Sequence, residues 1–456
     1  MTMKKFLTYL FSFLFALTSY AQNNLTGKWK IDADIQGLGV IQMLVDFTKT
    51  SDTTFYASSR PKALKDIIGG LKYAIAKNNK TYKNGSIVHI YKGVIRSDSL
   101  NGVLTTPMMN LYFEAKLQNG KMTGALFGKD KKTTYYEFTA MPYEKDFVNY
   151  DYVDLIANIK TTFQKNIYDA EILKTKEWTN FFTELDKLAP KIHDDIEMFM
   201  DFSFLANKIK MSHIAILKYN PWDSYSDNDT SKYISQVSHK MINEKTAYIK
   251  FEGFQLADTL VVRQFFKTII EQKIPTLIYD LRGCSGGDYS SMFLAQYLTN
   301  ETNEAGFFIG NKYYQNNRNL PDENTIKNLP DYNGKSLKEF LQTIVDNGLL
   351  KGKVSPDKEL HYSGKVYALI DNNSASATEP IAYFLKQHNL ATLVGETTAG
   401  KMLSSTVITV KDSWSLMLPV ADYYTSDRFR IEQKGVSPNI KVKSENVLDY
   451  VLKIAQ

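Results

Sequence analysis

The feature that most constrains the fold is the alternation of strand-like and helical patterns after residue 246. Apolar runs at 247–251, 275–281 and 365–370 are each followed by a segment with helical spacing of its apolar residues. Repeated strand–helix units bury a mostly parallel sheet between layers of helices. The sequence therefore predicts an α/β domain over residues 246–456.

The segment from 22 to 144 has a different pattern, with short runs of alternating polar and apolar residues. Asn-Gly pairs at 84–85, 101–102 and 119–120 separate these runs, and such pairs are strong hairpin signals. We predict an antiparallel β domain, built as a barrel or a sandwich. The triplet Gly27-Lys28-Trp29 is also typical of lipocalins. A lipocalin cup is the alternative to a plain accessory β domain, which we favour.

Between these two parts the apolar residues recur at helical spacing, and we predict a helical segment over residues 145–215. Its clearest stripe consists of Tyr152, Leu155, Ile156, Ile159 and Phe163. Residues 216–245 are polar and contain proline, which predicts a linker or hairpin.

The first residues, 1–21, have the pattern of a secretory signal peptide. Lys4 and Lys5 precede an apolar run, and small residues stand at the end of the segment, at Ser19 and Ala21. The alternative is an uncleaved membrane anchor, but the run is shorter than the roughly 20 residues that span a bilayer. We therefore expect export to the periplasm or the medium, with no membrane span after cleavage.

Composition excludes several classes of protein. The net charge of +6 over 456 residues is too small to indicate nucleic-acid binding, which needs clustered basic residues. A hydrophobic content of 43% excludes general disorder. The single cysteine, Cys284, excludes an intrachain disulfide and a zinc site built from several thiolates. Composition leaves the oligomeric state open.

The first segment that can carry chemistry is the loop 280–287, which follows a predicted strand. Its glycines at 283, 286 and 287 allow sharp turns that present backbone N–H groups to a ligand. Such a loop can stabilise a carbonyl oxygen that becomes negative. The alternative is an ordinary connection between a strand and a helix.

The second segment, 371–379, also lies between a predicted strand and a predicted helix. Ser376 would lie beside the positive end of that helix, where backbone N–H groups could stabilise the oxyanion formed when a serine attacks. The alternative is structural, because Ser376 and Glu379 have the spacing of a helix capping box.

The third segment, 395–402, nearly matches a nucleotide phosphate loop. It fails at Met402, where magnesium binding requires serine or threonine, and β-like sequence follows it. We therefore do not expect nucleotide binding, and Lys401 needs another role or is a surface lysine. The dipeptide Ser212-His213 is the fourth candidate, although a single histidine is more often structural.

Taken together, these segments resemble the C-terminal-processing (tail-specific) and tricorn-type serine peptidases. The resemblance runs from about 209 to 442 and includes the 280–287 loop, the Ser374–Glu379 segment and the Gly395–Lys401 segment. Gly435-Val436 and Pro438 are similar to the closing signature of the family. The resemblance implies a Clp-protease/crotonase-like βα spiral and a serine peptidase that needs neither metal nor nucleotide.

The family contains two ways of activating the serine, and this chain has residues for both. In tail-specific members a lysine 25 residues after the nucleophile is the base, and Lys401 has that spacing from Ser376. In tricorn-like members a Ser-His pair takes this role with a glutamate, which matches Ser212, His213 and Glu432.

Two departures from the tail-specific pattern favour the histidine. The stretch before the sheet is too short for a PDZ domain, and Ser405 stands where a glutamine often follows the lysine. Many tricorn-like relatives, however, have glycine at the position of Lys401. We favour His213 and leave Lys401 as the alternative.

The resemblance also assigns the remaining roles. Ser376 would attack a peptide carbonyl, and the amides of Ala377 and of Gly286 or Gly287 would form the oxyanion hole. Cys284 could in principle be a thiol nucleophile, but a small loop residue is the simpler interpretation. The partner would be a peptide or protein substrate. The rival function is that of a binding protein for peptides or apolar ligands, because some relatives use this fold without clear proteolysis.

Overall fold

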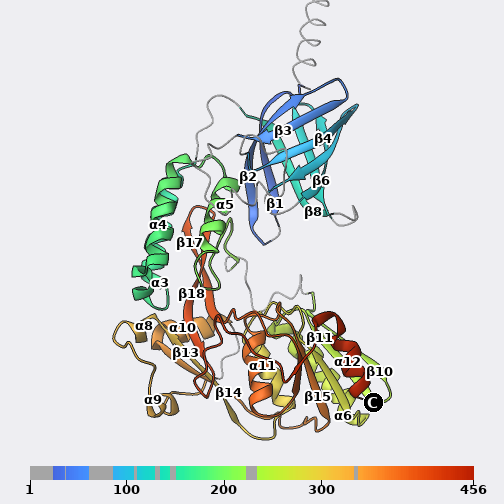
Figure 1. Cartoon of the computed structure of the whole chain (residues 1–456), viewed down its shortest axis with the longest axis vertical. Coiled ribbons are helices and arrows are strands. Elements are labelled where there is room, and N and C mark those ends of the chain that lie inside the picture. The colour runs from blue at the N-terminus through green and yellow to red at the C-terminus, as the bar shows by residue number, and fades with distance from the viewer. Residues whose placement is uncertain are drawn as a thin grey trace, which may run out of the picture.

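A computed structural model describes residues 24–35, 37–60, 86–106, 110–128, 134–143, 150–221, 234–332 and 337–455. The predicted signal peptide and the Asn-Gly pair at 84–85 lie outside these residues. Figure 1 shows a β domain at one end of the molecule, a larger body at the other, and helices between them.

The first part of the chain is a closed antiparallel barrel of strands in sequence order. Asn-Gly at 119–120 forms the tight turn between two of these strands, as the sequence predicts. The prediction of a turn at 101–102 is wrong, because both residues pair with the neighbouring strand inside the segment 99–105. The strands are β1 Gly27–Ile35, β2 Gly39–Lys49, β3 Thr54–Ser59, β4 His89–Arg96, β5 Ser99–Thr105, β6 Asn110–Gln118, β7 Lys121–Phe127 and β8 Thr134–Pro142.

The barrel interior is filled by aromatic rings. Trp29 and Phe47 are 6.2 Å apart between ring centroids, Phe47 and Phe55 are 5.7 Å apart, and Phe113 stacks on Phe138 at 5.1 Å. All five side chains are almost completely buried. These rings occupy the space that a ligand would need in a lipocalin cup, so the observed barrel fits the plain β domain that we favour.

The segment after the barrel is helical, as its periodicity predicts. The helices are α3 Tyr152–Asn166, the 3₁₀ turn η2 Ala170–Lys174, α4 Lys176–Leu188, the 3₁₀ turn η3 Ala189–Lys191 and α5 Asp195–Ala206. Asp151 caps α3 and Asp194 caps α5, each by accepting a backbone N–H of the first turn. The last of these helices ends at Ala206, inside the predicted segment 145–215.

The main sheet of the larger body has the order β10-β11-β12-β15-β16-β19. Its strands are β10 Val237–Asn243, β11 Thr246–Phe251, β12 Thr276–Asp280, β15 Lys365–Ile370, β16 Thr392–Gly395 and β19 Ile440–Lys441. All neighbours are parallel except β10, which forms an antiparallel hairpin with β11.

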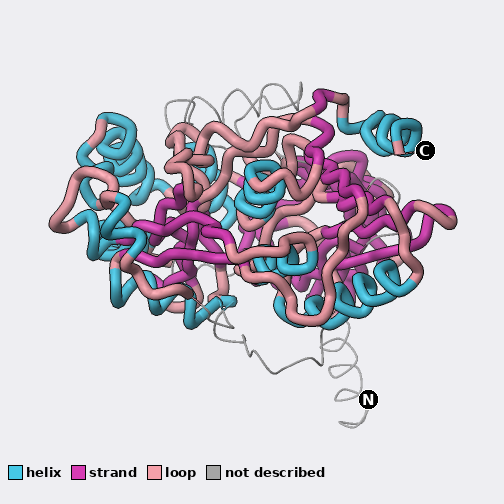
Figure 2. Tube along the Cα trace, turned by 90° about the horizontal axis from the view of Figure 1, so that it is seen from below, coloured by secondary structure: helices cyan, strands magenta, loops and turns pink. Residues whose placement is uncertain are grey.

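Both faces of this sheet are covered, which explains the continuous apolar runs in its strands. One face packs against α6 Thr259–Glu271 and α11 Thr378–Gln387, and the other packs against α12 Val447–Ile454. Ile249 and Ala368 face the first layer, whereas Tyr248 and Tyr367 face the second. Helices lie along the outside of these strands in Figure 2.

A second sheet has the order β14-β13-β18-β17, and the short strand β9 also pairs with β18. The strands are β9 Ala215–Leu217, β13 Asn303–Gly310, β14 Leu349–Val354, β17 Leu403–Lys411 and β18 Trp414–Tyr424. The hairpin of β17 and β18 rises from the larger body beside α3 and α5 toward the barrel (Figure 1). The base of this hairpin therefore belongs to the larger body, and its tip lies near the helical segment and the barrel (Figure 1).

The remaining elements have at most five residues, except the eleven-residue α10, and the sequence patterns do not predict most of them. They are η5 Leu256–Asp258, α7 Ser290–Phe293, η6 Leu294–Tyr297, α8 Asn311–Tyr314, α9 Glu323–Lys327, α10 Leu337–Asn347 and η7 Ser444–Asn446.

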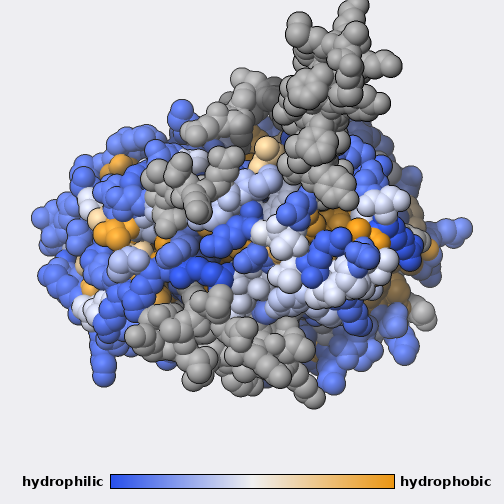
Figure 3. Space-filling model, turned by 90° about the horizontal axis from the view of Figure 1, so that it is seen from above, coloured by the Kyte–Doolittle hydropathy of each residue, from blue (hydrophilic) through white to orange (hydrophobic). Residues whose placement is uncertain are grey.

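The fold class expected from the sequence is confirmed, with an α/β domain preceded by an antiparallel β domain and a helical segment. Viewed from the barrel end, the described surface is mostly hydrophilic, with small separate apolar patches (Figure 3). Within the described ranges, no helix combines the length and the apolar character needed to cross a bilayer.

Candidate active site

Ser376 lies in the loop between β15 and α11, beyond the carboxyl end of a central parallel strand. Its backbone φ is +57°, a left-handed conformation that is uncommon for residues other than glycine. Its amide donates to the carbonyl of Lys401 at 3.1 Å, and the amide of Ala375 donates to the carbonyl of Cys284 at 3.0 Å. Two other loops therefore hold this serine in a conformation of the kind that concentrates at functional sites.

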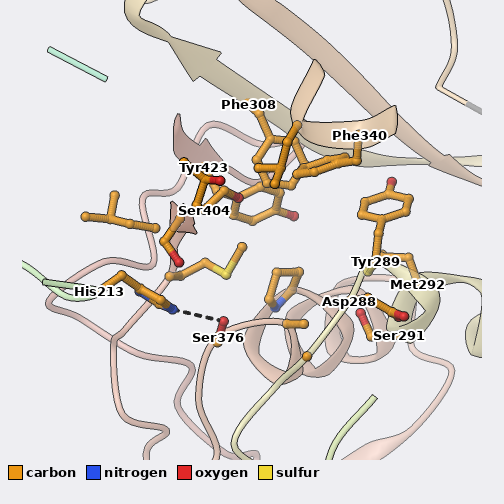
Figure 4. A pocket seen from close by; sticks show the side chains of 18 of the residues that line it. His213, Asp288, Tyr289, Ser291, Met292, Phe308, Phe340, Ser376, Ser404 and Tyr423 are labelled. Atoms are coloured by element: carbon orange, nitrogen blue, oxygen red, sulfur yellow. Dashed lines mark hydrogen bonds between the residues drawn. The ribbon is translucent and has the colours of Figure 1, made fainter. Parts of the chain in front are cut away.

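His213 approaches Ser376 from a distant part of the chain. Its Nε2 atom lies 3.2 Å from Ser376 Oγ, and the two side chains face each other in Figure 4. The backbone φ of His213 is also left-handed, at +61°. This geometry brings together the two residues that the sequence proposes as nucleophile and preferred base.

Glu432 reaches His213 through Ser212 rather than by direct contact. Its carboxylate accepts the Ser212 amide at 2.8 Å and the Ser212 hydroxyl at 2.9 Å, and that hydroxyl lies 2.8 Å from His213 Nδ1. Glu432 is buried and also accepts the amide of Met402 at 2.7 Å. The sequence proposes that glutamate and histidine act together, but the hydroxyl that joins them is visible only in the structure.

This chain of hydrogen bonds fixes the tautomer of His213. A carboxylate can only accept, so the single hydroxyl proton of Ser212 goes to Glu432. The hydroxyl oxygen must then accept from His213, which places the ring proton on Nδ1. Nε2 is left with its lone pair directed at Ser376, as a general base requires.

Burial lowers the pKa of His213 below its ordinary value, because the charged imidazolium loses hydration. The negative charge of Glu432 opposes this shift, and the positive charge of Lys401 adds to it. His213 is therefore held in the neutral form, which can accept a proton, to lower pH than an exposed histidine.

Lys401, the alternative base, lies at the open side of the site with His213 and Ser376. Its side chain is exposed, whereas a lysine base needs to lose its hydration. The backbone of Lys401, rather than its side chain, helps to position Ser376, because its carbonyl accepts the Ser376 amide. The strand β17 follows directly, so residues 395–402 do not open a helix as a phosphate loop does.

Glu379 does not complete a capping box with Ser376. The helix begins at Thr378, and its N-cap position has no side-chain hydrogen bond. The buried carboxylate of Glu379 instead accepts the hydroxyl of Thr398 at 2.6 Å and the amides of Gly400 and Lys401 at 2.7 Å each. Glu379 thus holds the loop whose carbonyl positions Ser376.

Of the predicted oxyanion-hole residues, Gly286 lies against Ser376 and Ala377, and Gly287 lines the cavity beside the serine. A Cβ atom added to Gly286 would be 2.6 Å from Ser376 Cβ and 2.9 Å from the Ala377 nitrogen, so only glycine fits there. Gly287 has a φ of +140°, and a Cβ there would be 2.1 Å from the Phe254 carbonyl oxygen. These positions require glycine for close approach as well as for conformation.

Cys284 is buried, and burial raises the pKa of its thiol, which keeps it from forming the reactive thiolate. Its backbone carbonyl accepts the Ala375 amide and the Thr378 hydroxyl, the latter at 3.1 Å. The residue therefore joins the 280–287 loop to the serine loop, which fits the simpler interpretation of a small structural residue.

Sequence reasoning missed the cavity beside the serine. It has a volume of about 190 Å³, and Ser376 and His213 form one wall. The opposite wall is aromatic, with Phe308, Phe340 and Tyr423 facing the serine across the cavity (Figure 4). Phe308 and Phe340 come from the stretch 303–354, where no motif marks the sequence.

Comparison with known proteins finds sequence similarity to a peptidase family over the part of the chain that contains Ser376. Residues 245–442 match the model of Peptidase family S41. The chain is 23% identical over 203 residues to the chloroplastic C-terminal processing peptidase of Tetradesmus obliquus, which covers 44% of this chain and 36% of that protein. It is 31% identical over 119 residues to the carboxy-terminal processing protease CtpA of Bacillus subtilis, covering 26% of this chain and 25% of the relative. These matches span about a third or less of the relatives' own length.

Two solved structures are similar to this chain. The photosystem II D1 C-terminal processing protease is 13% identical, with a TM-score of 0.41, and the alignment covers 68% of this chain and 98% of that one. The tricorn protease is 11% identical, with a TM-score of 0.39, over 90% of this chain and 53% of the other. The resemblance expected from the motifs is confirmed by the match of residues 245–442 to the model of Peptidase family S41.

Proposed function

We propose that this chain is an exported serine endopeptidase that hydrolyses peptide bonds through an acyl-enzyme on Ser376. The observation that carries the proposal is the 3.2 Å contact between His213 Nε2 and Ser376 Oγ. Ser212 and Glu432 support it, because they orient the imidazole in the tautomer that can accept the serine proton.

In the first half of the reaction, Ser376 Oγ attacks the carbonyl carbon of the scissile peptide bond and transfers its proton to His213 Nε2. The imidazolium that forms is stabilised through Ser212 by the buried charge of Glu432. His213 then gives the proton to the leaving amine, and an ester to Ser376 remains. Water, activated by the same histidine, hydrolyses this ester.

The negative oxygen of each tetrahedral intermediate needs hydrogen-bond donors. We assign this role to the amide of Ala377 and to the amide of Gly286 or Gly287, because Gly286 lies directly against Ser376 and Gly287 lines the cavity beside it. Donors fixed in advance are effective because they need no reorganisation during the reaction; removing one such donor typically costs about 10²–10³-fold in kcat.

The choice of His213 over Lys401 rests on their surroundings. His213 is partly buried, has a fixed tautomer and contacts the nucleophile, whereas the side chain of Lys401 is exposed. In this assignment the ammonium group of Lys401 acts only through its charge.

The aromatic cavity suggests the class of substrate. Its volume of about 190 Å³ exceeds that of an apolar cavity of about 150 Å³ that can hold a benzene ring. We therefore propose that a large apolar side chain of a peptide or protein substrate occupies it during attack. Export by residues 1–21 would place these substrates outside the cytoplasm.

A fluorophosphonate probe, which reacts with activated serines, tests the proposal. We expect the folded wild-type protein to be labelled, and the Ser376→Ala variant to remain unlabelled. Peptide mapping should locate the label on Ser376. A folded wild-type protein that is not labelled would overturn the proposal and favour the rival, a protein that binds peptides or apolar ligands.

A further inference from the structure

The histidine of the catalytic chain is held by a short segment of polypeptide. On one side, Ser212 is fixed by Glu432. On the other side, the strand β9 pairs with β18 through only three residues, Ala215–Leu217. Because His213 has a left-handed backbone, both sides must be anchored to keep its ring at 3.2 Å from Ser376 Oγ.

Lys218, the residue after β9, provides a second anchor through its side chain. Its ammonium group lies 2.8 Å from Asp195 Oδ2 and 4.6 Å from the centre of the Trp414 ring, at the tip of the β17–β18 hairpin. The lysine side chain is 17% exposed and that of Asp195 is 3% exposed, so both charges depend on each other for stabilisation.

Asp195 in turn binds the N-terminal barrel. Its Oδ2 atom accepts the amide of Gln42, and the neighbouring Asp194 accepts the amide of Leu44. Both amides belong to the part of β2 that extends beyond its pairing with β3. The two carboxylates thus accept hydrogen bonds from backbone N–H groups of β2 that have no neighbouring strand at this edge of the barrel.

The barrel also contacts the backbone of Lys218 directly. The amide of Lys218 donates to the Leu38 carbonyl at 2.6 Å. A Cβ atom added to Gly39 would lie 2.9 Å from the Lys218 carbonyl oxygen, so the β1–β2 turn is packed tightly on this residue. The barrel, α5 and the hairpin tip therefore meet at Lys218, five residues after His213.

We propose that Lys218 and Asp195 are positioning residues for the peptidase reaction: their ion pair fixes the N-terminal barrel against β9 and so holds His213 at hydrogen-bonding distance from Ser376. The role of the barrel is then to complete the active site rather than to bind a ligand. This inference rests on the proposed function, because it concerns the base of that reaction.

Loss of the pair should affect chemistry more than binding. The cavity wall opposite the serine is built from β13, α10 and β18, and the pair does not contact its residues. Misplacement of a catalytic group by about 1 Å can lower the rate by about 10²-fold. A purely structural role would instead lower stability and leave the folded enzyme fully active.

The experiment compares the wild type with Lys218→Met, Lys218→Arg and Asp195→Asn in the full-length protein. The rate of inactivation is measured at several fluorophosphonate concentrations. The maximal rate constant reports the chemical step, and the concentration that gives half of this rate reports binding of the probe. Circular dichroism verifies folding. The matched control is Lys160→Met, which removes another Lys–Asp pair, with Asp186 at 2.7 Å, on the helices α3 and α4.

We expect Lys218→Met and Asp195→Asn to lower the maximal inactivation rate about 10- to 100-fold with little change in the half-saturating concentration. Lys218→Arg, which keeps the charge, should recover most of the rate, and Lys160→Met should match the wild type. If Lys218→Met does not fold, Asp195→Asn decides the question alone.

The inference is overturned if the folded variants are inactivated at the wild-type rate, or if Lys218→Arg is as slow as Lys218→Met. These outcomes leave the proposed function intact, because the wild type is still labelled. If the folded wild type is not labelled, both the proposed function and this inference fail.

Discussion

Ser376 and His213 both have left-handed backbones, with φ of +57° and +61°. Neither conformation is favoured by the residue itself, so each depends on contacts from other segments. Sequence motifs predict candidates for the chemistry, but the contacts that fix them, such as the bond between Ser212 and Glu432, join residues 220 positions apart. At the residue scale, the sequence could therefore propose the candidate residues but not the geometry that holds them.

Gly286→Ala should abolish most of the activity. The added methyl group would lie 2.6 Å from Ser376 Cβ and 2.9 Å from the Ala377 nitrogen, which displaces both the nucleophile and an oxyanion donor. We expect kcat to fall by at least about 10²-fold. The matched control is Gly283→Ala in the same loop, where φ is also positive but no atom lies within 4 Å of the new Cβ. Equal peptide hydrolysis by the two variants would contradict the role of Gly286.

Lys401→Met should shift the pH dependence without removing activity. The charge of Lys401 lowers the pKa of His213, so removing it raises that pKa. Activity requires neutral His213 and falls as the pH drops through its pKa. The acidic limb of kcat/KM should therefore move to higher pH, while the rate on the alkaline side is retained. Lys453→Met, on an exposed turn of α12, should leave the profile unchanged. Loss of activity at every pH in Lys401→Met would identify the lysine as the base.

At the scale of elements, the spacing of Ser376 and Glu379 is ambiguous between a capping box and a catalytic loop. The two possibilities differ in what the Glu379 carboxylate contacts. Its observed partners are Thr398, Gly400 and Lys401, which lie in a loop that tertiary packing places against α11. The strands of the parallel sheet were predictable because burial on both faces leaves continuous apolar runs. The four-residue α8 and the five-residue α9 are too short to leave a periodic pattern.

Glu379→Ala should destabilise the fold and the serine loop together. It leaves two buried donors and the partly buried Lys401 amide without their acceptor, and each unsatisfied buried donor costs about 1–3 kcal/mol. We expect the free energy of unfolding in urea to fall by about 3 kcal/mol or more. Glu271→Ala, which removes an exposed pair with Lys267 at 3.9 Å, should change it by less than about 1 kcal/mol. Equal stability of the two variants would contradict the role given to Glu379.

At the scale of the whole molecule, the sequence predicted the order of a β domain, a helical segment and an α/β domain. It did not predict that the hairpin of β17 and β18 would connect them. In the sequence, Trp414 at the tip of this hairpin cannot be distinguished from an ordinary apolar residue of a strand. Its contact with Lys218 depends on how α5 and the barrel pack. The choice between a lipocalin cup and a plain barrel also depends on packing, since Phe47 or Phe113 could line either one.

The filled barrel predicts that the protein does not bind long apolar ligands there. Titration with a fluorescent fatty acid should give no saturable binding and no rise in Tm, because Trp29 and Phe113 are already buried in the interior. Saturable binding that Phe113→Ala alters would contradict this prediction and support the rival function.

The central claim is that His213, not Lys401, activates Ser376 for peptide hydrolysis. The most direct measurement is the turnover of a mixed peptide library by the wild type and by the Ser376→Ala, His213→Ala and Lys401→Ala variants. We predict that the first two variants lose at least about 10³-fold in turnover and that Lys401→Ala retains most of it at alkaline pH. Near-wild-type turnover by His213→Ala would contradict the account.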